Sequence, residues 1–121
     1  MQREFHWQVD LEHLVNRRYD AIVVTGTDRM IQWVSRGFRR MTGYAPEAVI
    51  GRKPSFLQGP LTDPDALQVL RDALQRSEPA RIELVNYRSN GEAYRCVVSI
   101  EPLYNTQNEV THFIAFEYAT P

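Results

Sequence analysis

The chain has 121 residues, 43% of them hydrophobic and 24% charged, which suits one globular domain with a single core and is too short for two. Its 14 Lys and Arg against 15 Asp and Glu leave a net charge of -1, which argues against nucleic acid as a partner because that binding rests on many phosphate contacts. The single cysteine, Cys96, excludes an internal disulfide, and no apolar run approaches the roughly 20 residues of a membrane-spanning helix. We therefore expect one cytoplasmic domain without membrane insertion.

Residues 1–18 are expected to form an amphipathic flanking helix ahead of the main domain, which takes residues 19–121. Apolar side chains recur in the first segment at helical spacing, among mostly polar neighbours. These apolar residues are Phe5, Trp7, Leu11 and Leu14. Because such a face is too apolar for a free helix in water, it must pack on its own domain or on a partner.

A β-hairpin is expected next. Residues 19–25 are rich in β-branched side chains, which favour strands, and residues 30–34 form a second short apolar run. Turn-forming residues at 26–29 separate the two runs and predict that they pair with each other.

Two short helical segments follow the hairpin. Ser35 is placed to cap a helix over residues 36–42, and Gly43 stands where a left-handed residue would end it. Pro46 then opens a further helical turn.

A longer helix is expected after an irregular stretch. Residues 53–60 contain prolines and a glycine and predict irregular backbone or a single turn. Asp63 before Pro64 is a helix start, and the helix should run to about Gln75. One face of this helix carries Leu67, Leu70 and Leu74.

The last third reads as consecutive strands at 81–88, 93–100 and 112–118. The pair Asn90-Gly91 between the first two predicts a type I′ hairpin turn. Strands, then short helices, then strands are typical of an α+β fold, here one antiparallel sheet with the helices over one face.

The middle of the chain carries a signature that resembles a PAS domain, and specifically the flavin-binding LOV branch of that family. The match runs from about Tyr19 to Tyr118. The residues that carry it are Ser35, Gly37, Phe38, Met41-Thr42-Gly43-Tyr44, Gly51-Arg52, Phe56-Leu57-Gln58-Gly59-Pro60, Thr62-Asp63, Asn86-Tyr87-Arg88 and Asn90-Gly91. The resemblance implies a five-stranded antiparallel sheet in spatial order 2-1-5-4-3, with short helices enclosing a pocket. In LOV proteins this pocket holds FMN, and a cysteine bonds to the flavin under blue light.

Three residues match positions through which the family contacts the flavin. Gln58 and Asn86 keep amides that face the ring, and Arg71 keeps an arginine that binds the phosphate. The resemblance therefore implies that the scaffold for a ligand persists in this chain.

Five residues depart from the family pattern at the same pocket. Lys53 replaces an asparagine, Pro54 the reactive cysteine, Ser55 an arginine, Cys96 an asparagine and Glu117 a glutamine. Proline has no nucleophilic atom, so the thiol adduct cannot form there. An ionised carboxylate and a thiol do not supply the paired donor and acceptor of an amide, and each unpartnered buried polar group costs ~1–3 kcal/mol. We therefore expect no cofactor, with FMN as the less favoured alternative.

Glu117 and Cys96 each have two interpretations. If the last strand keeps its phase, Glu117 faces the helical cover together with Phe113 and Ala115. It would then select a cationic or hydrogen-bond-donating ligand, or it would pair with Lys53 or bend toward water, which we favour. Cys96 is a redox sensor, a ligand contact or a small apolar filler, and we favour the filler. The candidate pocket residues are Gln58, Asn86, Arg71, Lys53, Cys96 and Glu117.

We expect a sensory or protein-interaction module cut from a larger signalling protein, such as a histidine kinase, a cyclase or a regulator. The alternative is a LOV-like sensor that binds flavin or another small ligand without cysteinyl adduct chemistry. An enzyme is not expected, since the chain offers no nucleophile with a base, no phosphate loop and no metal cluster. A homodimer is expected through the apolar face of residues 1–18 and the outer sheet face, which would otherwise expose Val85, Tyr87 and Val97.

Overall fold

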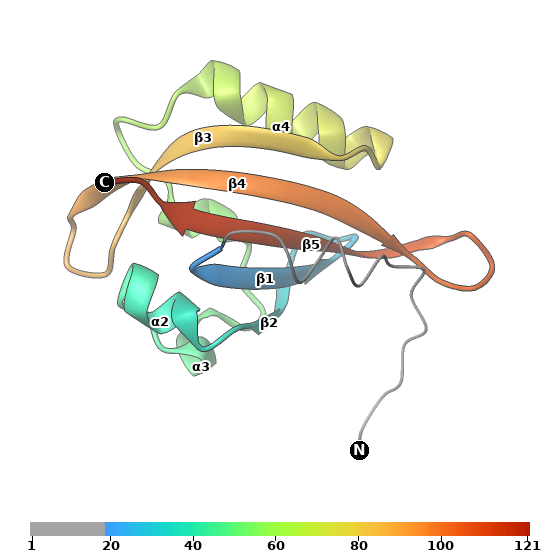
Figure 1. The fold of residues 1–121 in the computed structure, drawn as a ribbon, viewed down its shortest axis with the longest axis horizontal. Coiled ribbons are helices and arrows are strands. Elements are labelled where there is room, and N and C mark those ends of the chain that lie inside the picture. The colour runs from blue at the N-terminus through green and yellow to red at the C-terminus, as the bar shows by residue number, and fades with distance from the viewer. Residues whose placement is uncertain (1–18) are drawn as a thin grey trace.

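The computed structural model describes residues 19–121, and the expected flanking helix with Phe5, Trp7, Leu11 and Leu14 lies outside the described residues. One five-stranded antiparallel sheet carries a set of helices (Figure 1). The elements are β1 (Ala21–Gly26), β2 (Ile31–Val34), α2 (Gly37–Thr42), α3 (Pro46–Val49), the 3₁₀ turn η1 (Pro54–Leu57), α4 (Pro64–Arg76), β3 (Ala80–Tyr87), β4 (Ala93–Tyr104) and β5 (Val110–Ala119).

The strands lie in the order β2-β1-β5-β4-β3, which confirms the α+β architecture and the strand order expected from the resemblance. The last strand, β5, is therefore the centre of the sheet. Glu117 pairs with Ala21 on one side and with Val98 on the other. Because pairing with both neighbours fixes the register, each side chain of β5 is assigned to either the inner or the outer face of the sheet.

Two of the expected helix boundaries are confirmed by cap geometry. Gly43 is left-handed with φ 83°, and its N–H donates to the carbonyl of Arg39. The carboxylate of Asp63 accepts from the N–H of Asp65 at 2.9 Å, which satisfies one free donor at the start of α4.

The expected Ser35 cap is wrong. The residue that precedes α2 is Arg36, and no side-chain hydrogen bond caps this helix. The Ser35 hydroxyl instead accepts from the N–H of Ile22 at 2.8 Å. The Ser35 side chain is therefore directed to β1 and not to the start of α2.

The expected two-residue turn at Asn90-Gly91 is also wrong. A type I′ turn needs positive φ at both central residues, yet of these two only Gly91 is positive, at 88°. Arg88 accepts from the N–H of Gly91 and donates to the carbonyl of Glu92, which makes a three-residue loop with a left-handed glycine. The Asn90 side chain supports it by accepting from the N–H of Glu92 at 2.9 Å.

The core lies between the helices and the inner face of the sheet. Its largest fully buried side chains come from both layers: Phe38, Ile31, Val49, Thr42 and Cys96. The thiol of Cys96 is packed within this cluster at 0% exposure, as expected for an apolar filler.

The outer face of the sheet is less exposed than expected. Val97 is buried, and Val85 and Tyr87 are half-buried. The Tyr87 hydroxyl accepts from the N–H of Leu61 at 2.9 Å, so this ring is tied to the loop ahead of α4. The expectation is that this face is exposed unless a flanking segment or a partner covers it, and Val97 is already covered.

Gly37 at the start of α2 packs closely against the backbone just before β1. A Cβ built there would overlap the carbonyl oxygen of Asp20. We predict that Gly37→Ala lowers the free energy of unfolding by about 1–3 kcal/mol in chemical denaturation, because a backbone atom cannot move aside without a shift of the strand or the helix.

Gln75→Ala, at an exposed position of α4, is the matched control and should leave the stability close to that of the wild type. Equal stability of the Gly37→Ala variant and the control would contradict the prediction.

Candidate functional site

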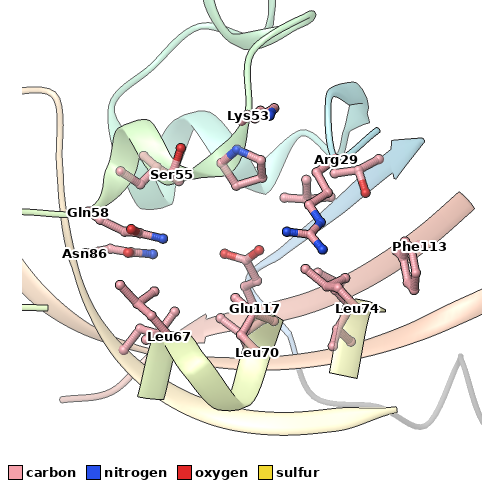
Figure 2. A pocket seen from close by; sticks show the side chains of 18 of the residues that line it. Arg29, Lys53, Ser55, Gln58, Leu67, Leu70, Leu74, Asn86, Phe113 and Glu117 are labelled. Atoms are coloured by element: carbon pink, nitrogen blue, oxygen red, sulfur yellow. The ribbon is translucent and has the colours of Figure 1, made fainter. Parts of the chain in front are cut away.

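A cavity of about 280 Å³ lies between the helical cover and the inner face of the sheet (Figure 2). Residues from β1, the β1–β2 turn, η1, α4, β3, β4 and β5 line it. The lining residues are Val23, Thr25, Arg29, Lys53, Pro54, Ser55, Leu57, Gln58, Leu67, Leu70, Arg71, Leu74, Leu84, Asn86, Val98, Ile100, Phe113, Ala115 and Glu117. Five of the six sequence-derived candidates are therefore together on one cavity, and Cys96 is the exception.

The α4 helix supplies an apolar wall. Leu67, Leu70 and Leu74 follow helical spacing and fall on one face, as the sequence indicated. Val98 and Ile100 of β4 line the same cavity from the sheet. Most of the surface that a ligand would meet is therefore hydrocarbon.

Two amides, Gln58 and Asn86, project into the cavity from the same side of the view in Figure 2. Asn86 is 5% exposed on β3, and Gln58 directly follows η1 in extended backbone. Each amide presents both a hydrogen-bond donor and an acceptor. This side of the cavity can therefore bind a polar edge of a ligand.

Glu117 points into the middle of the cavity from β5 (Figure 2), together with Phe113 and Ala115 of the same strand. The expected phase of the last strand is thus confirmed. The Glu117 carboxyl is only 6% exposed, and the thiol of Cys96 donates to its Oε1 at 3.6 Å. Burial raises the pKa of Glu117 to about 7, and the hydrogen bond from Cys96 opposes part of that rise.

The favoured interpretation of Glu117 is wrong. No ion pair joins it to Lys53, and its 6% exposure shows that it does not bend toward water. Lys53 lies on the exposed side of the cavity, ahead of η1, whereas the carboxylate extends from the sheet. The side-chain partner of Glu117 within residues 19–121 is Cys96.

Cys96 lies beside Glu117 on β4, outside the cavity lining. Burial and the neighbouring Glu117 charge raise the pKa of the Cys96 thiol well above its usual range. The thiol is thus a neutral donor to the carboxylate rather than a nucleophile, because the thiolate is the reactive form. Pro54 lines the opposite, helical side of the cavity at the first position of η1.

Three cationic side chains line the cavity: Arg29, Lys53 and Arg71. Lys53 and Arg71 are exposed, so they stand where the cavity meets solvent, and Arg29 is half-buried. Sequence reasoning missed Arg29, because a turn residue between two strands gives no sign of which way it points. Its backbone is left-handed with φ 72°, and its guanidinium extends into the cavity (Figure 2).

No group of three or more His, Cys, Asp or Glu within residues 19–121 is arranged to hold a metal ion. Over the same range, every helix is too short or too polar to cross a bilayer.

The fold and the ligand-sized cavity define a sensory domain of the PAS type. The family model described as "PAS domain" matches residues 20–117, and the chain belongs to this family. Within it, the chain is a LOV-like domain, homologous to the sensor domains of blue-light-activated histidine kinases.

Among curated proteins, the chain is similar to the blue-light-activated histidine kinases of Brucella canis and Brucella anthropi. The identities are 33% and 32% over 88 residues, which is 73% of this chain. The match spans only 18% of each kinase.

Among solved structures, the light state of the blue-light photoreceptor Aureochrome1 LOV has a TM-score of 0.83 at 27% identity, covering 93% of this chain and 90% of that one. The LOV domain of the Erythrobacter litoralis EL346 blue-light activated histidine kinase has a TM-score of 0.80 at 28% identity, covering 86% and 98%.

The buried carboxyl predicts a pH-dependent stability. The native pKa of Glu117, about 7, lies above its ordinary value of 4.5, so between these values the native state holds a proton that the unfolded chain has lost. The free energy of unfolding should therefore fall as pH rises through this window. The fall is about 3.5 kcal/mol at most, at about 1.4 kcal/mol per pH unit. Glu117→Gln should remove it, as measured by urea unfolding at several pH values.

Glu47→Gln, on an exposed site of α3, is the matched control and should keep the wild-type slope. Parallel pH profiles for the wild type and Glu117→Gln would show that the carboxyl does not titrate in this range.

Proposed function

We propose that this domain is the input module of a larger signalling protein, and that its pocket works without a cysteine–flavin bond. The observation that carries the proposal is where two residues lie: Pro54, which matches the reactive cysteine of the family, and Cys96, the one cysteine of this chain. Pro54 lines the cavity at η1, where the resemblance puts the reactive cysteine, while the Cys96 thiol donates to Glu117 from the sheet. Neither position offers a thiolate to a ligand in the cavity.

FMN does not fit the residues of this pocket well. Ligand pockets are commonly about 300–1,000 Å³, and this cavity of about 280 Å³ is at the small end for a molecule with a three-ring system and a ribityl phosphate. The carboxylate of Glu117 lies where the family places an amide, and once ionised it only accepts hydrogen bonds. We therefore propose that FMN is not the resident ligand.

The alternative is a flavin bound without adduct chemistry. Gln58, Asn86 and Arg71 favour it, because all three line the cavity at positions that match flavin contacts in LOV domains. A flavin held in this way could still be reduced, and the domain would then be a redox or light sensor.

The signal would leave the pocket through the end of β5. The carbonyl of Glu117 accepts from the N–H of Asp20 at 2.8 Å, and the N–H of Ala119 donates to the Asp20 carboxylate at 2.9 Å. Asp20 thus holds the backbone of β5 at the pocket-facing residue and two residues beyond it. In the sequence it follows the segment 1–18 with only Tyr19 between them. A change at the carboxyl would shift this clamp and with it the flanking segment.

The domain itself is a sensory unit, and we propose that any enzymatic activity belongs to an effector module of the parent protein. A histidine kinase, a cyclase or a response regulator would each serve. The kinase relatives support the first, although the chain spans 18% of their length. A cytoplasmic location suits the single reduced cysteine.

We predict that the purified protein is colourless and does not quench the fluorescence of added FMN. A variant with Lys53→Asn, Pro54→Cys, Ser55→Arg, Cys96→Asn and Glu117→Gln should bind FMN and bleach under blue light, since these changes return the family residues to a retained scaffold. Absorption spectroscopy before and after illumination is the measurement.

The matched control carries the same changes but keeps Pro54, and it should bind FMN without bleaching. A yellow wild-type protein with bound flavin would overturn the proposal that FMN is not the resident ligand, whatever the variants do.

We also propose a homodimer through Phe5, Trp7, Leu11 and Leu14 and the outer sheet face. Trp33 supports it, because this large aromatic on β2 is 51% exposed. Light scattering coupled to gel filtration should report a dimer, and Trp7→Ser with Leu11→Ser should shift it to a monomer. Leu61→Ser, at a 67% exposed position, is the control that should stay dimeric. A monomeric wild type would exclude this interface.

A further inference from the structure

We propose that the cavity binds a small bipolar organic molecule, with a cationic, hydrogen-bond-donating group against Glu117 and an anionic group against Arg29. The inference rests on the proposed sensory function, because this molecule would be the signal that the pocket detects. It differs from a flavin in size and in charge arrangement. It also uses Arg29, a residue that the family signature does not include.

Glu117 is the first half of the argument. Its two oxygens can accept about four hydrogen bonds, and the one side-chain donor within residues 19–121 is a thiol at 3.6 Å, a weak and long contact. The carboxyl is 6% exposed, so water reaches it poorly. A buried carboxylate without strong donors is costly, whereas a charge-assisted pair with a ligand is among the strongest polar contacts. The site therefore favours a donor that enters the cavity.

Arg29 is the second half. Its guanidinium lines the cavity and makes no hydrogen bond or ion pair with any other residue in the range 19–121. The turn that presents it is well fixed, since the N–H of Arg29 donates to the carbonyl of Gly26 at 3.0 Å and Asp28 accepts from the N–H of Met30 at 2.9 Å. A non-glycine residue in left-handed backbone often marks a functional position. The guanidinium offers a planar set of donors that matches a carboxylate or phosphate.

The two charges face the same cavity without pairing. Figure 2 shows the Arg29 guanidinium and the Glu117 carboxylate both extending into the space, and no ion pair joins them. The space beside them is bounded by the apolar wall of Leu67, Leu70 and Leu74. A molecule that contacts both charges and also fills the cavity therefore carries apolar surface that packs against this wall. At about 280 Å³, the cavity has room for a small organic molecule with a ring between its polar ends.

The competing explanation is an internal lid. Arg29 could swing onto Glu117 and close the cavity with an ion pair, so that no ligand is needed. A lid predicts that the cavity excludes every probe. It also predicts that removing Arg29 opens the cavity to neutral molecules.

Three matched probes separate these explanations: 4-amidinobenzoate, benzamidine and benzoate. The first has both charged ends, and each of the others lacks one. Each probe is titrated into the ¹⁵N-labelled chain and followed by NMR at pH 8. At this pH Glu117 is mostly ionised, since its pKa is about 7. We expect 4-amidinobenzoate to shift the amides of β5 and α4 and to bind at least about tenfold more tightly than either control, given the strength of charge-assisted pairs.

Two variants test the assigned ends. Glu117→Gln should reduce 4-amidinobenzoate binding to about the level of benzoate, and Arg29→Gln should reduce it to about the level of benzamidine. Arg40→Gln, an exposed arginine on α2, should bind like the wild type. If Glu117→Gln does not fold, Glu117→Asp keeps the charge but withdraws it by one methylene, and it should still weaken the amidine end.

The inference fails if none of the probes shifts cavity residues, or if neither Glu117→Gln nor Arg29→Gln alters the order of affinities. Its failure is distinct from that of the proposed function. Exclusion of both the probes and FMN overturns only the bipolar ligand. Exclusion of the probes with tight binding of FMN overturns the bipolar ligand and the flavin-free input module together.

Discussion

A carboxyl group in the centre of an apolar cavity is the feature on which this structure depends most. Glu117 is held there because β5 pairs with β1 on one side and with β4 on the other, which fixes its side chain on the cavity face, where it is only 6% exposed. Burial then favours the protonated form, and the nearest donor is the Cys96 thiol. The same residue is therefore central to the predicted pH dependence of stability, to the chemistry of the pocket and to the proposed path of the signal.

The pocket combines the fold of LOV domains with a different set of polar side chains. The fold is shared with the solved LOV domains that the chain resembles. Under the proposed function, the amides of Gln58 and Asn86 keep the family pattern, whereas Pro54 on the helical side and Glu117 on the sheet side depart from it. A fold fixes where side chains meet, but the side chains decide which molecule is recognised. A LOV-like domain can thus retain its relay while it detects another signal.

We propose a short path for the signal. Asp20 is bonded twice to the end of β5: its N–H donates to the carbonyl of Glu117, and its carboxylate accepts from the N–H of Ala119. A proton or a ligand at the Glu117 side chain would act on a strand whose end is clamped to the residue that precedes β1. β5 is therefore a suitable element to carry a change toward the residues that precede β1 in the sequence.

The sequence by itself determined the family, the strand order and most helix boundaries, because these depend on local turn and cap residues such as Gly43, Asp63 and Pro64 and on a specific signature. It also indicated the inward phase of Phe113, Ala115 and Glu117 from strand alternation. Only the tertiary structure decided the partners of the polar groups: Cys96 rather than Lys53 for Glu117, and Ile22 rather than a helix for Ser35. Arg29 became visible as a cavity residue in the same way. Hydrogen-bond and charge partners come from segments far apart in the chain, so their choice depends on distances that no local pattern contains.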